Sequence, residues 1–146
     1  MFQRILIAWD GSEVALRAFD VAIDVTRRYD AELTAVSIAY SPAQAETAAD
    51  RAESADAAHR YLEATFDEVK DRAERAGVEV THEIIEGNTP GRALLAYVHR
   101  HGTDLIVCGH HHERRAGRLL LKGITQDLMD RAPVPLLVVS DGTHES

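Results

Sequence analysis

The sequence predicts an α/β protein built on an open parallel sheet of five strands, with helices on both faces. Short apolar runs of strand length alternate along the chain with segments whose apolar residues recur at helical spacing, five of the first kind and four of the second. One run, DLIVCGH at 104–110, is apolar almost throughout, which is typical of a strand covered on both faces. Because parallel strands need crossover connections, this alternation predicts helices on both sides of the sheet.

The first strand, turn and helix follow one another without interruption. RILIAWD at 4–10 is an apolar run that ends in Asp10, and Gly11 and Ser12 continue a sequence that favours a turn and a helix start. A helix is expected from there to about residue 30, and AELTAVSIAY at 31–40 then predicts the second strand. The apolar face of the helix comprises Ala15, Ala18, Phe19, Ala22 and Val25.

A connection rich in small residues separates the second strand from a long helix. Residues 41–53 contain Pro42 and many alanines, and they predict a mobile connection. From about Ser54 an amphipathic helix is expected to run to Gly77, a residue suited to a left-handed helix end. The apolar face of this helix comprises Ala58, Leu62, Phe66, Val69 and Ala73.

The second half of the chain continues the alternation. Residues 78–87 have the pattern of a half-covered edge strand, and Thr89 and Pro90 predict the N-cap and first position of the next helix. That helix is expected to close at Gly102, before the buried strand at 104–110. The remaining elements are a helix at 119–131, a strand at 136–140 and a polar tail at 142–146.

Length and composition indicate a single soluble domain over residues 1–146. A chain of this length buries one core, and no apolar run approaches the roughly 20 residues of a membrane span. The opening MFQRILIAWDGS passes directly into a strand-like run, so we expect no signal peptide and a cytoplasmic location. The net charge of −8 argues against general nucleic-acid binding. Cys108, the only cysteine, is expected to be a small buried residue.

Two polar segments are expected at the carboxyl ends of strands, where open parallel sheets bind their ligands. They are WDGS after the first strand and GHHHERRAGRLLLKG, residues 109–123, after the fourth. Between His110 and Lys122 the second segment has a formal charge of +4 − 1 = +3. Positive charge ahead of a helix start predicts a phosphate or carboxylate site, and a solvated loop paired with nearby carboxylates is the alternative. The basic residues are Arg114, Arg115, Arg118 and Lys122, and the acidic one is Glu113.

Asp10 has two interpretations. In the first, its carboxylate serves the turn and the following helix together with Gly11 and Ser12. In the second, it lines the ligand crevice, where it bonds to a hydroxyl or a base, or holds Mg²⁺ or Mn²⁺ beside phosphates. The sequence leaves both interpretations open.

Spacing disfavours several other chemistries. His110, His111 and His112 are consecutive, so their side chains diverge in an extended loop, and we expect no metal site. The P-loop pattern fails because Lys122 precedes Gly123 and no Ser or Thr follows in place, and no G-x-G-x-x-G follows the first strand. No general base or nucleophile is placed by spacing, so the sequence argues against an enzyme and allows weak ATP hydrolysis at most.

Both ends of the chain resemble universal stress proteins. ILIAWDGSEVALRAFDVAIDVTRRYDAELTAVSI resembles their opening, and DLIVCGH with GRLLLKGITQDLMDRAPVPLLVV resembles their ending, so the similarity covers nearly the whole chain. The resemblance implies the strand order 3-2-1-4-5 of an adenine nucleotide alpha hydrolase-like sheet. It also implies a homodimer through the last strand, Leu136–Ser140. An apolar, uncharged edge strand agrees with such pairing.

The resemblance further implies an ATP site in altered form. One branch of the family binds ATP through a pattern resembling G-x2-G-x9-G-[ST], and the aspartate after the first strand, here Asp10, lines the same pocket. The pattern falls on Gly109, His112, Lys122 and Gly123 of this sequence. Only Gly109 matches. His112 and Lys122 would adopt the glycine conformations of a phosphate nest only with strain.

The resulting hypothesis is a dimeric binding and regulatory module with an ATP-like ligand, accompanied by Mg²⁺ where the phosphates need it. Asp10, the 109–123 loop and the end of the second strand near Ser37 and Ile38 would form the crevice. Cations of the loop, such as Arg115, would supply a positive field in place of the hydrogen bonds that are lost with the pattern glycines. The alternative is a family member that does not bind ATP and acts through protein contacts, with the basic loop docking an acidic partner.

Overall fold

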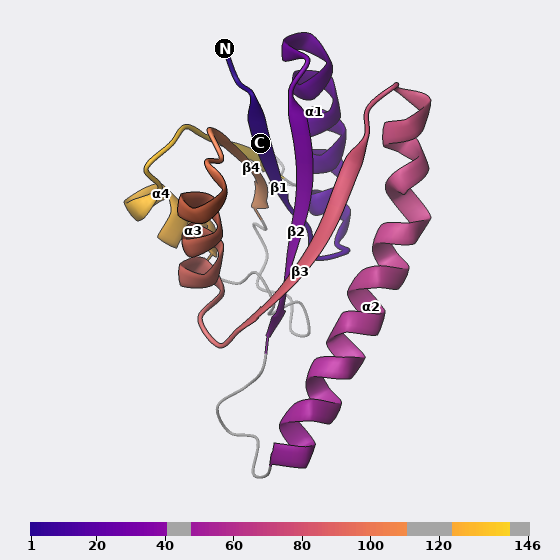
Figure 1. Ribbon diagram of the computed structural model, residues 1–146, viewed down its shortest axis with the longest axis vertical. Coiled ribbons are helices and arrows are strands. Elements are labelled where there is room, and N and C mark those ends of the chain that lie inside the picture. The colour runs from indigo at the N-terminus through magenta and orange to yellow at the C-terminus, as the bar shows by residue number, and fades with distance from the viewer. Residues whose placement is uncertain (41–47, 111–123, 141–146) are drawn as a thin grey trace, which may run out of the picture.

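Strands and helices alternate along the chain in the computed structural model, which describes residues 1–40, 48–110 and 124–140 (Figure 1). The elements are β1 (Arg4–Ala8), α1 (Glu13–Tyr29), β2 (Glu32–Tyr40), α2 (Ala48–Arg75), β3 (Val80–Gly87), α3 (Pro90–His101), β4 (Leu105–His110), α4 (Ile124–Arg131) and β5 (Leu136–Ser140). Neighbouring strands are parallel, and their order is β3-β2-β1-β4-β5. The predicted fold class and strand order are confirmed.

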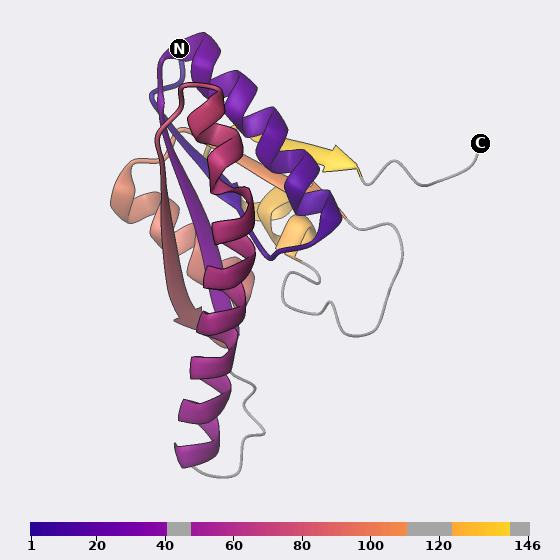
Figure 2. The same cartoon turned by 90° about the vertical axis from the view of Figure 1, so that its right-hand side faces the viewer.

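Helices cover both faces of the sheet (Figures 1 and 2). α1 and α2 pack over one apolar core, and α3 and α4 over another on the opposite face. The side chains of β1 alternate between the two cores: Ile5 and Ile7 join the first, and Leu6 and Ala8 the second. β4 is buried over five of its six residues. Burial on both faces explains why these two strands form nearly continuous apolar runs in the sequence.

The two edges of the sheet are β3 and β5. β3 was expected at an edge, and this prediction is confirmed. Most of its residues are partly exposed, in contrast to the buried β1 and β4. α2 packs beside β2 and β3, and its first turns extend past the carboxyl ends of these strands (Figures 1 and 2).

The expected start of α2 is wrong. The helix begins at Ala48 and not near Ser54, so residues 48–53, predicted as part of a mobile connection, are helical. Alanine, glutamate and arginine are strong helix formers, so the helix begins earlier than the small side chains of this segment had indicated. α2 is 28 residues long but rich in charge. Among the described residues no helix is both long and apolar enough to cross a bilayer.

The predicted helix ends are confirmed in part. Gly77 and Gly102 have positive φ angles of 77° and 66°, as the left-handed ends of helices require. Pro90 begins α3, but the hydroxyl of the preceding Thr89 makes no capping hydrogen bond. It donates instead to Asn88 Oδ1 at 3.4 Å. The start predicted for α4, at residue 119, and the tail at 142–146 lie outside the described residues.

Candidate functional site

β1 and β4 lie side by side and run in the same direction. Their register pairs Ile5 with Leu105 and Ile7 with Val107. The turn that follows β1 and the loop that follows β4 therefore leave the sheet at one edge, which we call the carboxyl edge. The order of the strands reverses between these two strands. We expected the segments after the first and fourth strands to lie together. This prediction is confirmed for the strands themselves, β1 and β4.

Asp10 fixes the turn at the end of β1. The residue is 6% exposed, and its Oδ1 accepts hydrogen bonds from the Ser12 backbone N–H at 2.9 Å and the Ser12 hydroxyl at 2.5 Å. Ser12 Oγ in turn accepts the Ala15 N–H at 3.2 Å and so caps α1. The structural interpretation of Asp10 is confirmed. The same carboxylate lies at the carboxyl edge, beside the positive end of the α1 dipole.

α2 covers this turn from the side. Gly11 has a φ of 83°, and a Cβ atom on it would lie 3.0 Å from Thr65 Cγ2 and 3.1 Å from the Tyr61 hydroxyl. Trp9, buried against Phe66, donates its indole N–H to Thr65 Oγ1 at 3.1 Å. Sequence reasoning missed Trp9 and Thr65. A tryptophan beside a turn aspartate is itself a signal, because a buried indole N–H requires an acceptor.

Gly109 lets α1 approach β4 closely. A Cβ atom on this buried glycine would lie 2.9 Å from the backbone oxygen of Val14 in the first turn of α1. The Gly109 carbonyl accepts a hydrogen bond from the Thr125 hydroxyl at 3.4 Å, which joins the start of α4 to β4. Burial raises the pKa of the neighbouring Cys108 thiol to about 11. Cys108 is therefore the small buried residue that was expected.

Ser37 and Ile38 point to opposite faces of β2. The Ser37 hydroxyl is fully buried and forms a hydrogen bond with His82 Nε2 at 2.8 Å. His82 stacks on Phe66 with a centroid distance of 4.3 Å. Burial lowers the pKa of His82 to about 4, although Asp67 acts in the opposite direction. Ile38 is packed into the core beneath α3 and α4. The described contacts of both side chains are thus with the protein interior.

The remaining predicted site residues lie outside the described parts of the chain. They are His112, Arg115, Lys122 and Gly123, together with the rest of the basic loop. Over residues 1–40, 48–110 and 124–140, no group of three or more His, Cys, Asp and Glu side chains could hold a metal ion.

The fold and the site together define a class of protein. An open parallel sheet whose strand order reverses beside a polar turn is a doubly wound α/β protein. Proteins of this class usually bind their ligands where the strand order reverses, at the carboxyl ends of the strands. The model of the universal stress protein family matches residues 1–140, and the chain belongs to this family. A putative universal stress protein from Staphylococcus haemolyticus is 31% identical over 140 residues, which cover 94% of this chain and 84% of the relative.

Two solved structures of nucleotide complexes share the fold. One is a universal stress protein in complex with cAMP, with a TM-score of 0.71, 24% identity and 99% coverage of each chain. The other is the universal stress protein from Archaeoglobus fulgidus in complex with dAMP, with a TM-score of 0.68 and 16% identity. That match covers 94% of this chain and 98% of the other. At these identities the likeness establishes the shared fold.

Proposed function

We propose that this chain is a binding and regulatory module that holds an adenine nucleotide of the ATP type at the carboxyl edge. The pairing of β1 with β4 carries the proposal, because it brings the Asp10 turn and Gly109 to one edge. The two family members in complex with cAMP and dAMP support it, since both ligands combine an adenine base with a phosphate. In open sheets of this type the switch in strand order is the usual place for such a ligand.

Each part of the crevice would recognise a different part of the nucleotide. The Asp10 carboxylate would accept a hydrogen bond from a ribose hydroxyl or from the base. The side chain of Ile38 is turned into the core, so β2 would contact the base through its backbone. The start of α4 at Ile124 would favour phosphate through its free N–H groups and its dipole. Positive charge and backbone donors would come from Gly109, His112, Arg115, Lys122 and Gly123.

Mg²⁺ would enter together with the phosphates. The described residues supply no cluster of side chains for a metal ion, and Asp10 is a single carboxylate in the turn after β1. One carboxylate fits the ordinary chemistry of this ion, which is commonly held by one or two carboxylates and the phosphates of its nucleotide. When bound, the ion would screen the phosphate charges from Asp10.

Isothermal titration of the purified chain with ATP and Mg²⁺ tests the nucleotide site. We expect saturable binding. Asp10→Asn keeps an oxygen for Ser12 but removes the charge, and it should weaken binding about ten-fold, as expected for losing a hydrogen bond to a charged group. Asp56→Asn, on the exposed side of α2, removes the same charge elsewhere and should leave binding unchanged. A flat titration at millimolar ATP would contradict the proposal.

A second candidate function is protein contact without ATP. The replacement of two pattern glycines by His112 and Lys122 favours it, since these residues fit a phosphate nest poorly. The basic loop would then dock an acidic partner. This function is supported if titration with ATP gives no heat and a polyglutamate peptide binds the chain. The peptide should no longer bind after Arg114, Arg115 and Arg118 are changed to Ser.

We also propose a homodimer through β5. The strand pairs with β4 on one side, and its Val138 side chain is 39% exposed. An apolar edge strand favours pairing with a second copy. Val138→Lys should therefore yield a monomer in analytical ultracentrifugation. Thr81→Lys in β3, the other edge strand, should leave the dimer intact. A monomeric wild-type chain would refute this interface.

We propose no catalytic role for the described residues, and weak ATP hydrolysis at most. The hydroxyl of Ser37 and the thiol of Cys108 are both fully buried, and the raised pKa of Cys108 keeps it protonated at neutral pH. Steady ATP turnover that depends on Asp10 would contradict this view. The cytoplasmic location stays a prediction.

A further inference from the structure

The middle of α2 flanks the carboxyl edge of the sheet. His59 is hydrogen-bonded to Glu86, near the end of β3, with 3.3 Å between Nε2 and Oε2. Two residues further along the helix, the Tyr61 hydroxyl lies 3.1 Å from the position that a Cβ atom on Gly11 would occupy, and Thr65 lies beside the same glycine. This stretch of α2 therefore joins the end of β3 to the turn after β1, and it forms one side of the proposed nucleotide site.

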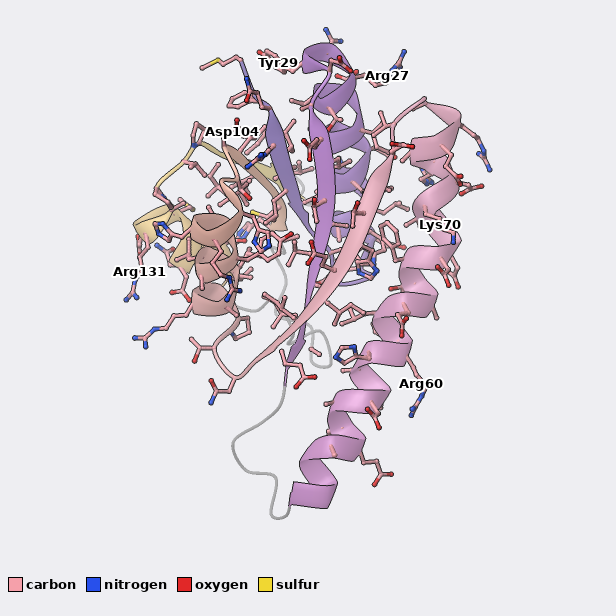
Figure 3. All side chains as sticks on the ribbon, viewed as in Figure 1. Arg27, Tyr29, Arg60, Lys70, Asp104 and Arg131 are labelled. Carbon is pink, nitrogen blue, oxygen red and sulfur yellow. The ribbon has the colours of Figure 1, made fainter. Side chains whose placement is uncertain are left out.

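Tyr61 extends from α2 toward the turn, whereas the preceding Arg60 points away from the sheet (Figure 3). The hydroxyl can approach Gly11 because this residue has no side chain. Adding the 3.1 Å contact, a Cα–Cβ bond of about 1.5 Å and the 3.8 Å or so between consecutive Cα atoms places this hydroxyl within about 8.4 Å of the Asp10 Cα atom. A ligand held by Asp10 is therefore within reach of the Tyr61 ring.

The Tyr61 ring has no use in the described fold. The residue is 41% exposed, and it forms no hydrogen bond or aromatic pair with another described residue. By contrast, the ring of Tyr29 packs against Phe2, and that of Tyr97 stacks on His101. Tyrosine combines a large apolar ring with a polar tip and is enriched at binding surfaces. The described structure thus leaves the Tyr61 ring open to a ligand.

We propose that Tyr61 stacks on the base of the nucleotide held at the carboxyl edge, an inference that rests on the proposed function. Aromatic rings pair with their centroids roughly 4.5–7 Å apart, so the base would lie between this ring and the Asp10 turn. Asp10 would accept a hydrogen bond from the base or the ribose while the ring covers the base. Every base has a π face, so Tyr61 supplies affinity and leaves the choice of base to polar contacts.

Calorimetric titration of the full chain with ATP and Mg²⁺ tests the role of Tyr61. Tyr61→Ala removes the ring and should weaken binding about ten-fold, as is usual for the loss of one aromatic ring stacked on a base. Tyr61→Phe keeps the ring and should bind ATP within about two-fold of wild type.

Tyr29→Ala is the matched control. Tyr29 has the same exposed fraction, 41%, and is the last residue of α1, at the other end of this helix from the Asp10 turn (Figure 3). A helix of this length separates the two by roughly 25 Å. Tyr29→Ala should therefore leave ATP binding unchanged.

The outcomes separate the role of Tyr61 from the nucleotide site itself. A flat wild-type titration would overturn both. Saturable binding with equal affinity in wild type and Tyr61→Ala would overturn the role of Tyr61 alone. A loss in Tyr61→Phe as large as that in Tyr61→Ala would also overturn it, because the hydroxyl and not the ring would then be responsible.

Two spectroscopic measurements distinguish stacking from a structural effect. Trp9 bonds to Thr65, one turn further along α2, so its fluorescence in ligand-free Tyr61→Ala should match that of wild type if the turn is intact. In the ATP complex we expect nuclear Overhauser effects between the Tyr61 ring and the adenine protons, with the ring signals assigned by their loss in Tyr61→Ala. An assigned Tyr61 ring without such effects in the saturated complex would overturn the stacking.

Discussion

Gly109→Ala is the substitution whose effect follows most directly from the geometry. The added methyl carbon would lie 2.9 Å from the Val14 carbonyl oxygen, whereas ordinary contact begins at 3.4 Å, so the two groups must separate by 3.4 − 2.9 = 0.5 Å. The Val14 carbonyl is part of the backbone of α1, so it cannot rotate away as a side chain could. Its helix must therefore move, and the Ser12 cap and Asp10 turn move with it.

Such a forced shift in a close-packed core costs about 1–3 kcal/mol, and we expect about 2 kcal/mol here. For a chain of this size that corresponds to a fall in Tm of about 4–8 °C. Urea unfolding followed by the fluorescence of Trp9, the only tryptophan, gives the free energy of unfolding. The same probe lies beside the turn that is expected to move.

Gly77→Ala is the matched control. Nothing lies within 4 Å of a Cβ atom at this position, but φ is 77°, so the only cost is a left-handed backbone conformation, about 1–2 kcal/mol. It should leave the environment of Trp9 unchanged. A free energy of unfolding for Gly109→Ala within about 0.5 kcal/mol of wild type would refute the argument that close contact of α1 with β4 requires glycine.

Three further predictions concern buried polar groups. Burial lowers the pKa of His82 from its ordinary value of 6.5 to about 4 in the folded chain, so the unfolded chain binds more protons between these two pH values. The free energy of unfolding should therefore fall as the pH drops from about 6.5 to 4. In a series of denaturant titrations at different pH values, the fall should be shallower for His82→Gln. Thr65→Val leaves the indole N–H of Trp9 without its acceptor and should lower the free energy of unfolding by about 1–3 kcal/mol in urea, while equal stability would show that the bond is dispensable. Cys108 should react with a thiol reagent at pH 8 only after unfolding, because its thiol is buried and its pKa is about 11; rapid labelling of the folded chain would contradict its burial.

Most of the fold could be predicted from the sequence because buried positions are occupied by apolar residues. β1 and β4 are covered on both faces and are apolar over nearly their whole length, and Gly102 marks a left-handed helix end. The start of α2 was misjudged because alanine suits both a connection and a helix. Small side chains lower the signal of amphipathic spacing there, although they favour the helix.

The site was less predictable because its contacts join distant parts of the chain. Asp10 and Gly109 could be placed at one edge, since parallel strands end together. The bond from Trp9 to Thr65 spans 56 positions and that from Ser37 to His82 spans 45, and no local pattern indicates either one. Ser37 was expected near a ligand because it lies late in β2, but only the packing of the sheet decides which face a side chain meets.

The proposed adenine nucleotide binds at the carboxyl edge between β1 and β4. An NMR titration of the ¹⁵N-labelled chain with ATP and Mg²⁺ locates the bound ligand residue by residue. We expect saturable shifts of the backbone amides of Asp10–Ser12 and Gly109, with those of Thr26–Thr34, at the opposite ends of the strands, unchanged. Saturable shifts confined to Thr26–Thr34, or no shifts at millimolar ATP, would contradict binding at the carboxyl edge.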